Sequence, residues 1–112
     1  MMRLLRLRLA MTVVYNKYMT GWVYIMTNRY NRVLYTGVSS DLKGRVQKHK
    51  ARYYPRSFTA RYNLMKLVYY EQFDSIRDAI RREKQIKGGT RQKKLNLINH
   101  LNPEWEDLYD TL

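Results

Sequence analysis

A carboxylate on the apolar face of an expected helix is the first candidate for chemistry. Periodicity predicts a helix over residues 75–87, and Glu83 shares a face with its apolar side chains, because positions three and four apart are neighbours. Those side chains are Ile76, Ala79, Ile80 and Ile86. A carboxylate on the core side is costly unless it is paired or binds a metal. Glu83 is therefore either the salt-bridge partner of a base such as Arg45 or a ligand for a divalent cation.

Basic side chains gather on a second expected helix, over residues 41–52. They are Lys43, Arg45, Lys48, Lys50 and Arg52, with His49 among them. Arg45, His49 and Arg52 share one face through their i, i+4, i+7 spacing. An arginine at the edge of the packed side could bind a phosphate through two hydrogen bonds, and His49 could transfer a proton near neutral pH. The alternative is a solvated basic face.

Two tyrosines occupy the centres of two expected strands. Residues 22–28 and 33–38 are β-branched and aromatic and are separated by a polar turn around Asn31, which predicts a β-hairpin. In a simple register Tyr24 and Tyr35 lie roughly opposite each other on one side of the sheet. Two buried tyrosines are usually core residues whose hydroxyls need partners, so on their own they do not establish catalysis.

The elements that must position these residues follow from turn and capping patterns. A third strand is expected over 65–73, and 53–63, which contains a proline, is expected to be a loop with a short helical turn. The helix at 75–87 begins at Ser75, with Asp78 in a capping-box position, and ends before a Gly-Gly pair. The fold class is thus α+β, a small three-stranded, mostly antiparallel sheet flanked by helices.

The C-terminal region is expected to be helical. Thr90 can cap a helix that runs to about Leu101. Asn102 and Pro103 form an N-cap and first-turn pair, which predicts a final short helix. Four apolar residues then recur at helical spacing and should pack onto the body: Trp105, Leu108, Tyr109 and Leu112.

Charge points to an anionic partner. Lys and Arg number 22 against 9 acids, a net charge of +13, and residues 1–102 alone carry +17 because four acids lie in the last ten residues. Such a surface attracts polyanions, and nucleic acid is the expected partner. The alternatives are a generic basic surface or contact with an anionic membrane. No apolar run approaches the roughly 20 residues that span a bilayer.

The first 20 residues differ from the rest of the chain. They carry Arg3, Arg6 and Arg8 and no acid, so they are either a weak targeting-like segment or a basic extension. We expect a poorly ordered extension over residues 1–20 and one domain over residues 21–112. The chain has no cysteine, which excludes disulfides and thiolate zinc sites. A cytoplasmic location is expected.

In this order, the motifs resemble the GIY-YIG nuclease superfamily. The first motif is present as residues 22–24 (Trp-Val-Tyr) and the second as residues 35–37 (Tyr-Thr-Gly). Residues 41–45 with the following histidine look like the family's first helix, and 81–87 (RREKQIK) look like its metal-binding helix. Short stand-alone bacterial members end in a sequence similar to residues 102–109. Together the spacings are specific, although the first glycine and the central isoleucines are replaced.

The resemblance implies a role for each residue of an active centre. Tyr24 would position and deprotonate the attacking water, and Tyr35 would complete that hydrogen-bond network or share the base role. Arg45 would neutralise charge on the phosphate, and His49 would relay protons or hold a tyrosine hydroxyl. Glu83 would bind Mg²⁺ or Mn²⁺. The family's late asparagine is not placed by spacing, and Asn96, Asn99 and Asn102 remain candidates. A groove wall for nucleic acid is expected from Lys43, Lys48, Arg52, Arg56, Arg61 and Lys66.

The resemblance therefore implies a metal-dependent endonuclease that acts on nucleic acid, DNA rather than RNA, with a role in repair or recombination. Two alternatives have the same fold, but in neither does this chain cleave nucleic acid by itself. One is an inactive nucleic-acid-binding module, and the other is an accessory subunit of a larger nuclease or repair complex. A homodimer also remains open, since nothing in the sequence identifies an interface.

Overall fold

The structure is a computed structural model that describes residues 19–112. Its elements are β1 (Gly21–Thr27), β2 (Leu34–Ser39), α2 (Leu42–Lys50), α3 (Phe58–Arg61), β3 (Lys66–Phe73), α4 (Ile76–Lys87), α5 (Arg91–Leu101) and the 3₁₀ helix η1 (Leu108–Thr111). These bounds agree with the predicted strands, with the first three predicted helices and with the short helical turn in the loop. The predicted extension over residues 1–20 lies almost entirely outside the described residues.

The three strands form one antiparallel sheet in the order β2-β1-β3. The β1–β2 turn closes because Asn31 adopts a left-handed φ of 58° and its N–H donates to the Asn28 carbonyl at 3.0 Å. The Asn28 side chain also accepts hydrogen bonds from the backbone N–H groups of Arg32 and Val33. The predicted α+β class with a hairpin and a third strand is confirmed, and both strand pairs are antiparallel.

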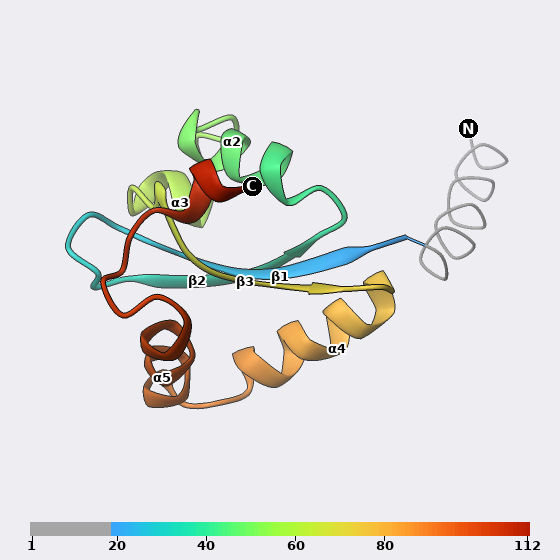
Figure 1. Cartoon of the computed structure of the whole chain (residues 1–112). Coiled ribbons are helices and arrows are strands. Elements are labelled where there is room, and N and C mark those ends of the chain that lie inside the picture. The colour runs from blue at the N-terminus through green and yellow to red at the C-terminus, as the bar shows by residue number, and fades with distance from the viewer. Residues whose placement is uncertain (1–18) are drawn as a thin grey trace, which may run out of the picture.

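Helices cover both faces of this sheet (Figure 1). The face with Val23 and Ile25 packs against α4 and α5, whereas the face with Tyr24 and Met26 packs against α2 and the segment after it. Alternation of side chains along β1 produces these two cores. Because β1 is central and apolar on both sides, residues of one strand contribute to two separate layers.

Side-chain caps begin three helices, and two of the caps, Ser75 and Thr90, are those predicted from the sequence. The side chains of Asp41, Ser75 and Thr90 accept hydrogen bonds from backbone N–H groups in the first turns of α2, α4 and α5. Gly88 ends α4 with a right-handed φ of −75°. The capping rules are local, which is why they hold without knowledge of the tertiary structure.

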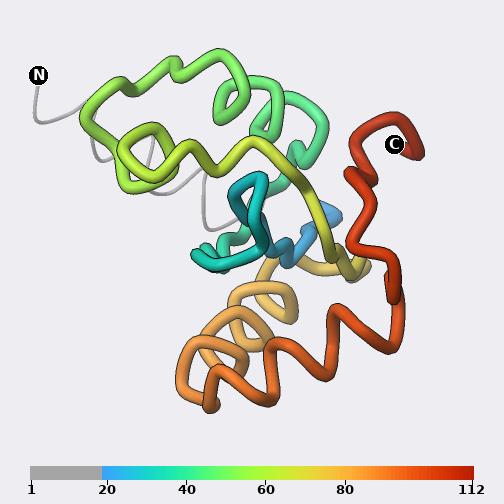
Figure 2. Tube along the Cα trace, turned by 90° about the vertical axis from the view of Figure 1, so that its left-hand side faces the viewer, coloured from blue at the N-terminus to red at the C-terminus, as the bar shows by residue number. Residues whose placement is uncertain are grey.

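The prediction that Asn102 and Pro103 open a helix is wrong. Asn102 is buried, and its side-chain amide donates to the carbonyls of Val68 at 3.1 Å and Glu106 at 2.8 Å. Trp105 has a left-handed φ of 53°, which no helix accommodates. Only η1 forms, and the apolar residues pack on two cores: Trp105 on the α4–α5 side and Leu108 with Tyr109 on the other. The segment crosses along one side of the sheet (Figure 2).

Within the described residues, no helix has the length and apolar character that crossing a membrane requires.

Candidate active site

Tyr24 lies on β1 with its ring extended over the neighbouring strand. Its side chain is 1% exposed, and its register partner on β2 is Gly37. A Cβ atom built on Gly37 would lie 2.5 Å from both Cζ and Oη of Tyr24, closer than van der Waals contact allows. The glycine is therefore required for the Tyr24 ring to lie against β2 at this position.

Tyr35 faces the same side of the sheet as Tyr24. Its register partner is Met26, so the two tyrosines are diagonal neighbours. A simple register predicted that they would lie roughly opposite each other. Their ring centroids are 6.2 Å apart. The prediction that they share a face holds because both pairs obey the two-residue period of the sheet.

His49, in the last turn of α2, completes an aromatic cluster with these tyrosines. Its Nε2 atom lies 2.9 Å from the Tyr24 hydroxyl, and its ring centroid is 5.7 Å from that of Tyr35. Burial, assisted by the positive charge of Arg45, lowers the pKa of His49 below its usual value. The imidazole is thus neutral at pH 7 and free to accept a proton.

The Tyr24 hydroxyl holds its proton firmly in the free protein. Burial is the main cause of its raised pKa, followed by the Tyr35 hydroxyl, whereas Arg45 acts in the opposite direction. The carboxylate of Glu83 also raises this pKa, so its charge acts on the phenol. Tyr24 is therefore a neutral phenol before substrate binds, hydrogen-bonded to a neutral imidazole.

Arg45 occupies the first turn of α2 and is exposed. It lies one turn before His49, and its charge lowers the pKa of both His49 and Tyr24. None of the ion pairs between described residues involves Arg45. The guanidinium is thus a cation beside the two aromatic residues, available to an anion from solution.

Glu83 lies on α4, on the other layer of the fold, and only 15% of its side chain is exposed. Its ion-pair partner is Lys87, at 3.4 Å, and the alternative pairing with Arg45 is not formed. α4 packs against both β1 and β2. From this position the charge of Glu83 still acts on Tyr24, as the weakest of the effects that shift the pKa of that phenol.

The donor set fits a cation that is held jointly with substrate. In the described part of the chain, no three acidic or imidazole side chains cluster as a complete protein-made metal site would require. Mg²⁺ commonly keeps several waters and binds through one or two carboxylates plus substrate phosphate. A single, largely buried carboxylate such as Glu83, whose charge acts on the Tyr24 phenol, suits that kind of site.

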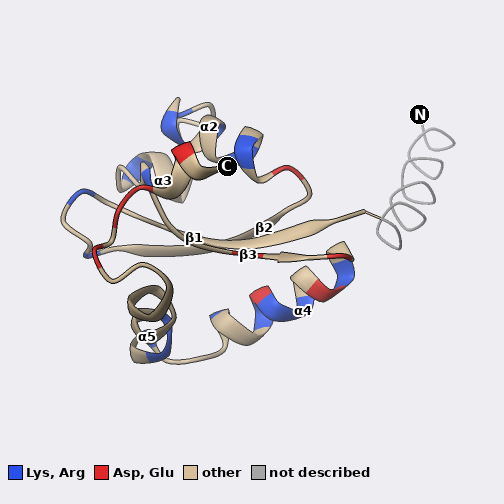
Figure 3. Ribbon diagram, in the orientation of Figure 1, with Lys and Arg blue, Asp and Glu red and all other residues tan. Residues whose placement is uncertain are grey.

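The predicted nucleic-acid-binding residues lie mostly around α2 and α3, and Lys and Arg also occur on α4 and α5 (Figure 3). Lys48 lies over the Tyr53 ring at 5.2 Å, and Arg61 lies 6.0 Å from the Tyr62 ring centre. Arg52 donates to the Asn63 side chain. Arg56 is exposed in the loop before α3. Cations and exposed aromatic rings therefore alternate along this side of the molecule.

A groove of about 700 Å³ continues this surface towards the hairpin. It is lined by Asn28, Arg29, Tyr30, Lys50, Tyr62, Asn63, Met65, Lys66 and Asp107. Lys66 is the one predicted binding residue in it. Lys43 lies elsewhere, in a pocket beside Asp41 and Trp22. Four of the six predicted residues therefore lie between the end of α2 and α3, whereas Lys43, at the start of α2, and Lys66, on β3, line two other pockets.

Sequence reasoning missed two contacts of this cluster. Phe58 stacks on Tyr35 with ring centroids 6.1 Å apart, and Thr59 lies 2.9 Å from His49 Nδ1. Both residues belong to α3, which was expected only as a turn in a loop. The serine that caps α3, Ser57, was the one local signal that a helix would present these side chains.

The three asparagine candidates take structural positions. Asn102 joins the C-terminal segment to β3 through its hydrogen bond to the Val68 carbonyl. Asn99 accepts a hydrogen bond from the Trp105 indole at 2.6 Å, and Asn96 accepts one from Gln92. All three hold α5 or the turn directly after it, and α5 lies on the layer opposite to α2.

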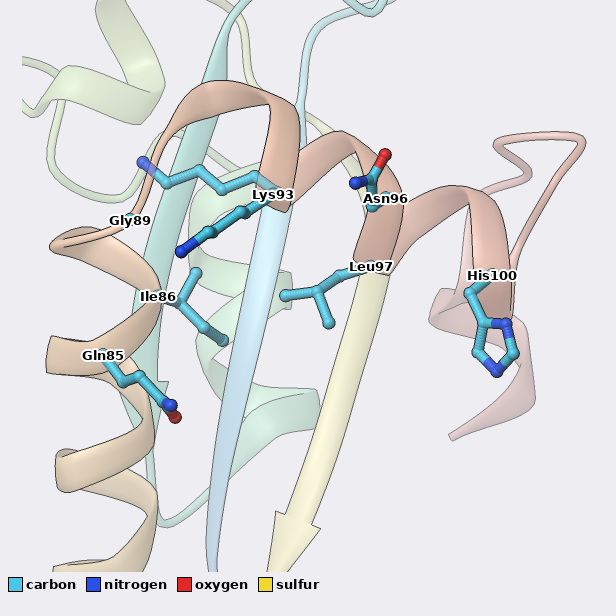
Figure 4. A pocket seen from close by; sticks show the side chains of 8 residues that line it. Gln85, Ile86, Gly89, Lys93, Asn96, Leu97 and His100 are labelled. Carbon is cyan, nitrogen blue, oxygen red and sulfur yellow. The ribbon is translucent and has the colours of Figure 1, made fainter.

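A second pocket, of about 350 Å³, lies between α4 and α5 (Figure 4). Ile86 and Leu97 form its apolar floor, and Lys93 and His100 lie at its rim. Of the candidate residues named from the sequence, Asn96 alone lines it. This pocket therefore belongs to the packing of two helices and is separate from the Tyr24–His49 cluster.

Comparison with known proteins gives one consistent result. Residues 20–96 match the family model of the GIY-YIG catalytic domain. A UPF0213 protein of Syntrophus aciditrophicus is 37% identical over 84 residues, which cover 75% of this chain and 94% of the relative. A UPF0213 protein of Staphylococcus aureus is 43% identical over 69 residues, 58% of this chain and 78% of the relative. The solution NMR structure of a UPF0213 protein from Bacillus halodurans has a TM-score of 0.51 at 28% identity, and covers 80% of this chain and 93% of that one.

Proposed function

This chain belongs to the GIY-YIG family, and from that membership we propose that it is a metal-dependent endonuclease that hydrolyses phosphodiester bonds, with DNA as the favoured nucleic acid. One observation carries the proposal. The Tyr24 hydroxyl is 2.9 Å from a neutral His49, and the charges of Arg45 and Glu83 both act on that phenol. A hydroxyl in contact with a proton acceptor, together with a cation and a carboxylate whose charges act on that hydroxyl, supplies the groups that phosphodiester hydrolysis needs.

Tyr24 and His49 act as a pair in proton transfer. A phenol with a raised pKa is a poor base alone, but its own proton can pass to the imidazole as it takes one from the attacking water. The lowered pKa of His49 keeps that imidazole unprotonated at neutral pH. Tyr35 lies beside both rings and orients the water or the Tyr24 hydroxyl.

Arg45 and Glu83 have electrostatic roles in the reaction. Arg45 binds the scissile phosphate and stabilises the negative charge that builds on its oxygens in the transition state. Glu83 would hold the divalent cation, which supplies Lewis-acid polarisation of the phosphate when bound. In the free protein Lys87 neutralises Glu83, and an i,i+4 pair of this exposure is weak enough to be exchanged.

The basic and aromatic side of α2 and α3 is proposed to hold the nucleic acid on either side of the cleaved bond. Cations there contact phosphates, and exposed rings such as Tyr53 and Tyr62 offer faces for stacking. This surface adjoins the site through Phe58, which contacts both Tyr35 and Tyr62.

A cleavage screen tests the proposal. Nuclease-free protein is incubated with duplex, branched, nicked and single-stranded DNA, and with RNA, with Mg²⁺, with Mn²⁺ or with chelator. We expect metal-dependent products that disappear in Glu83→Gln, whereas Glu104→Gln, an exposed acid near the C-terminus, keeps wild-type activity.

Folded protein that binds but cuts none of these substrates with either metal would contradict the proposal. That result would favour the non-catalytic alternatives, a binding module or an accessory subunit.

A further inference from the structure

A buried hydroxyl outside the five predicted residues contacts the centre of the site. Thr59 is 3% exposed, and its Oγ1 lies 2.9 Å from Nδ1 of His49. Tyr24 Oη lies 2.9 Å from Nε2 of the same ring. Each ring nitrogen of His49 therefore has one hydroxyl partner, from β1 on one side and from α3 on the other.

A third hydroxyl extends this arrangement towards the surface. Ser57 Oγ lies 3.1 Å from Thr59 Oγ1 and accepts a hydrogen bond from the Ala60 N–H at 3.3 Å. Ser57 is half-buried, whereas Thr59 is buried. The Thr59 proton thus has two partners within reach, the Ser57 oxygen and the His49 nitrogen.

The direction of these hydrogen bonds follows from acidity. A phenol is far more acidic than an aliphatic hydroxyl, so Tyr24 is the better donor to a neutral imidazole. When Tyr24 donates to Nε2, the single proton of the neutral ring is on Nδ1 and points at Thr59. Thr59 then accepts from Nδ1 and donates to Ser57, which keeps a free lone pair beside the one used by Ala60.

We propose that Thr59 is a positioning residue, which accepts a hydrogen bond from Nδ1–H of His49 and so keeps Nε2 unprotonated and aimed at the Tyr24 hydroxyl. The inference rests on the proposed function and deepens it. In the reaction one proton moves from the attacking water to Tyr24 Oη, and the Tyr24 proton moves to Nε2. The water oxygen forms its bond to phosphorus, the bond to the leaving oxygen breaks, and that oxygen is protonated by the imidazolium or by solvent.

Thr59 accepts the same hydrogen bond before and after this transfer, because Nδ1 carries a proton in both forms of the ring. The ring therefore needs no reorientation at the moment of reaction. The opposite arrangement, with Thr59 donating to Nδ1, would place a proton on Nε2 and leave His49 unable to accept one from Tyr24.

Nitrogen-15 NMR of the imidazole tests the inference without any substrate. Protein labelled at histidine is recorded above pH 7, with His49→Gln used to assign the signals. We expect the Nδ1–H tautomer for His49 in wild-type protein. A His49 that carries its proton on Nε2 overturns the inference, whether or not the protein cleaves nucleic acid.

Two substitutions complete the test. Thr59→Val keeps the shape and removes the hydroxyl, and it should lower kcat about 10- to 100-fold, part of a general acid–base contribution, with little change in KM. Thr59→Ser should restore both kcat and the Nδ1–H tautomer. Thr36→Val is the matched control, because Thr36 is also buried and its Oγ1 has no hydrogen-bond partner among the described residues.

The outcomes separate the two proposals. Wild-type kcat and an unchanged tautomer in folded Thr59→Val would overturn the role of Thr59 and leave the proposed nuclease activity intact. Absence of cleavage by wild-type protein would overturn the nuclease proposal, and the tautomer would still decide whether Thr59 orients His49. If Thr59→Val does not fold, the His49 tautomer in the nitrogen-15 spectra of the wild-type protein and of Thr59→Ser decides whether Thr59 orients His49.

Discussion

The Tyr24 ring lies over Gly37 of the adjacent strand, so closely that a Cβ atom on Gly37 would fall 2.5 Å from the phenol oxygen. This contact fixes the position of the hydroxyl, on which the charges of Arg45 and Glu83 act. The glycine at this position is therefore explained by the close approach of a side chain, since its φ is not left-handed.

Gly37→Ala should displace the Tyr24 hydroxyl. We expect a loss of about 1–3 kcal/mol in the free energy of unfolding, the scale of overpacking, and a clear fall in cleavage rate. Gly88→Ala is the control, because its added Cβ meets only helix backbone, at 3.3 Å from the Lys84 carbonyl oxygen, and its φ suits alanine. Urea unfolding and cleavage assays measure both effects. Equal behaviour of the two variants would show that the Tyr24 ring can move without consequence.

Arg45→Ala should act on the rate and much less on binding. Loss of one group that stabilises the transition state lowers kcat by about 10²- to 10³-fold. Arg56→Ala removes an exposed charge of the proposed binding surface and should weaken binding with kcat unchanged. Single-turnover cleavage and fluorescence anisotropy separate the two quantities. A fall in affinity alone for Arg45→Ala would move that residue from the reaction centre to the binding surface.

Stability should depend on pH through His49. Because burial lowers the pKa of His49 in the folded protein, the unfolded chain takes up its proton first as the pH falls below about 6.5. The free energy of unfolding therefore falls as the pH drops from about 6.5 to the pKa of His49 in the folded protein. It is fully restored when the pH is raised above about 6.5 again. Urea unfolding at pH 8 and pH 5.5 should show a larger loss for wild-type protein than for His49→Gln.

The exposed His100 on α5 supplies the control for that experiment. His100→Gln should retain the wild-type dependence of stability on pH. If the His49→Gln and His100→Gln variants lose stability equally between the two pH values, the buried imidazole is not the source of the effect.

Arg61 and Arg56 should contribute to the salt dependence of binding. For each phosphate that an alanine variant no longer neutralises, the slope of log Kd against log salt concentration should fall by about 0.9 on duplex DNA and about 0.7 on a single strand. Lys93→Ala, on α5 at the opposite layer, should leave the slope unchanged. Anisotropy titrations between low and moderate salt measure the slopes, and identical values for all three variants would remove the α2–α3 surface from the interface.

The features that the sequence determined are those governed by near neighbours in the chain. The caps Ser75 and Thr90 satisfy N–H groups two and three residues away, so their position follows from local rules. The same is true of the hairpin at Asn31 and of Glu83 on an otherwise apolar face. The prediction of a helix cap at Asn102 failed because its side-chain amide donates a hydrogen bond to the carbonyl of Val68, 34 residues earlier in the chain.

Only the tertiary structure decided how the site residues meet. Sequence spacing placed Tyr24 and His49 on different elements, and the packing of α2 on the sheet brought them within a hydrogen bond. The same packing brought Thr59 to His49 and left Glu83 with Lys87 as its partner. The distance between two elements depends on how their whole faces pack against each other. Many core side chains determine that packing together, so the site residues alone do not predict which of them come into contact.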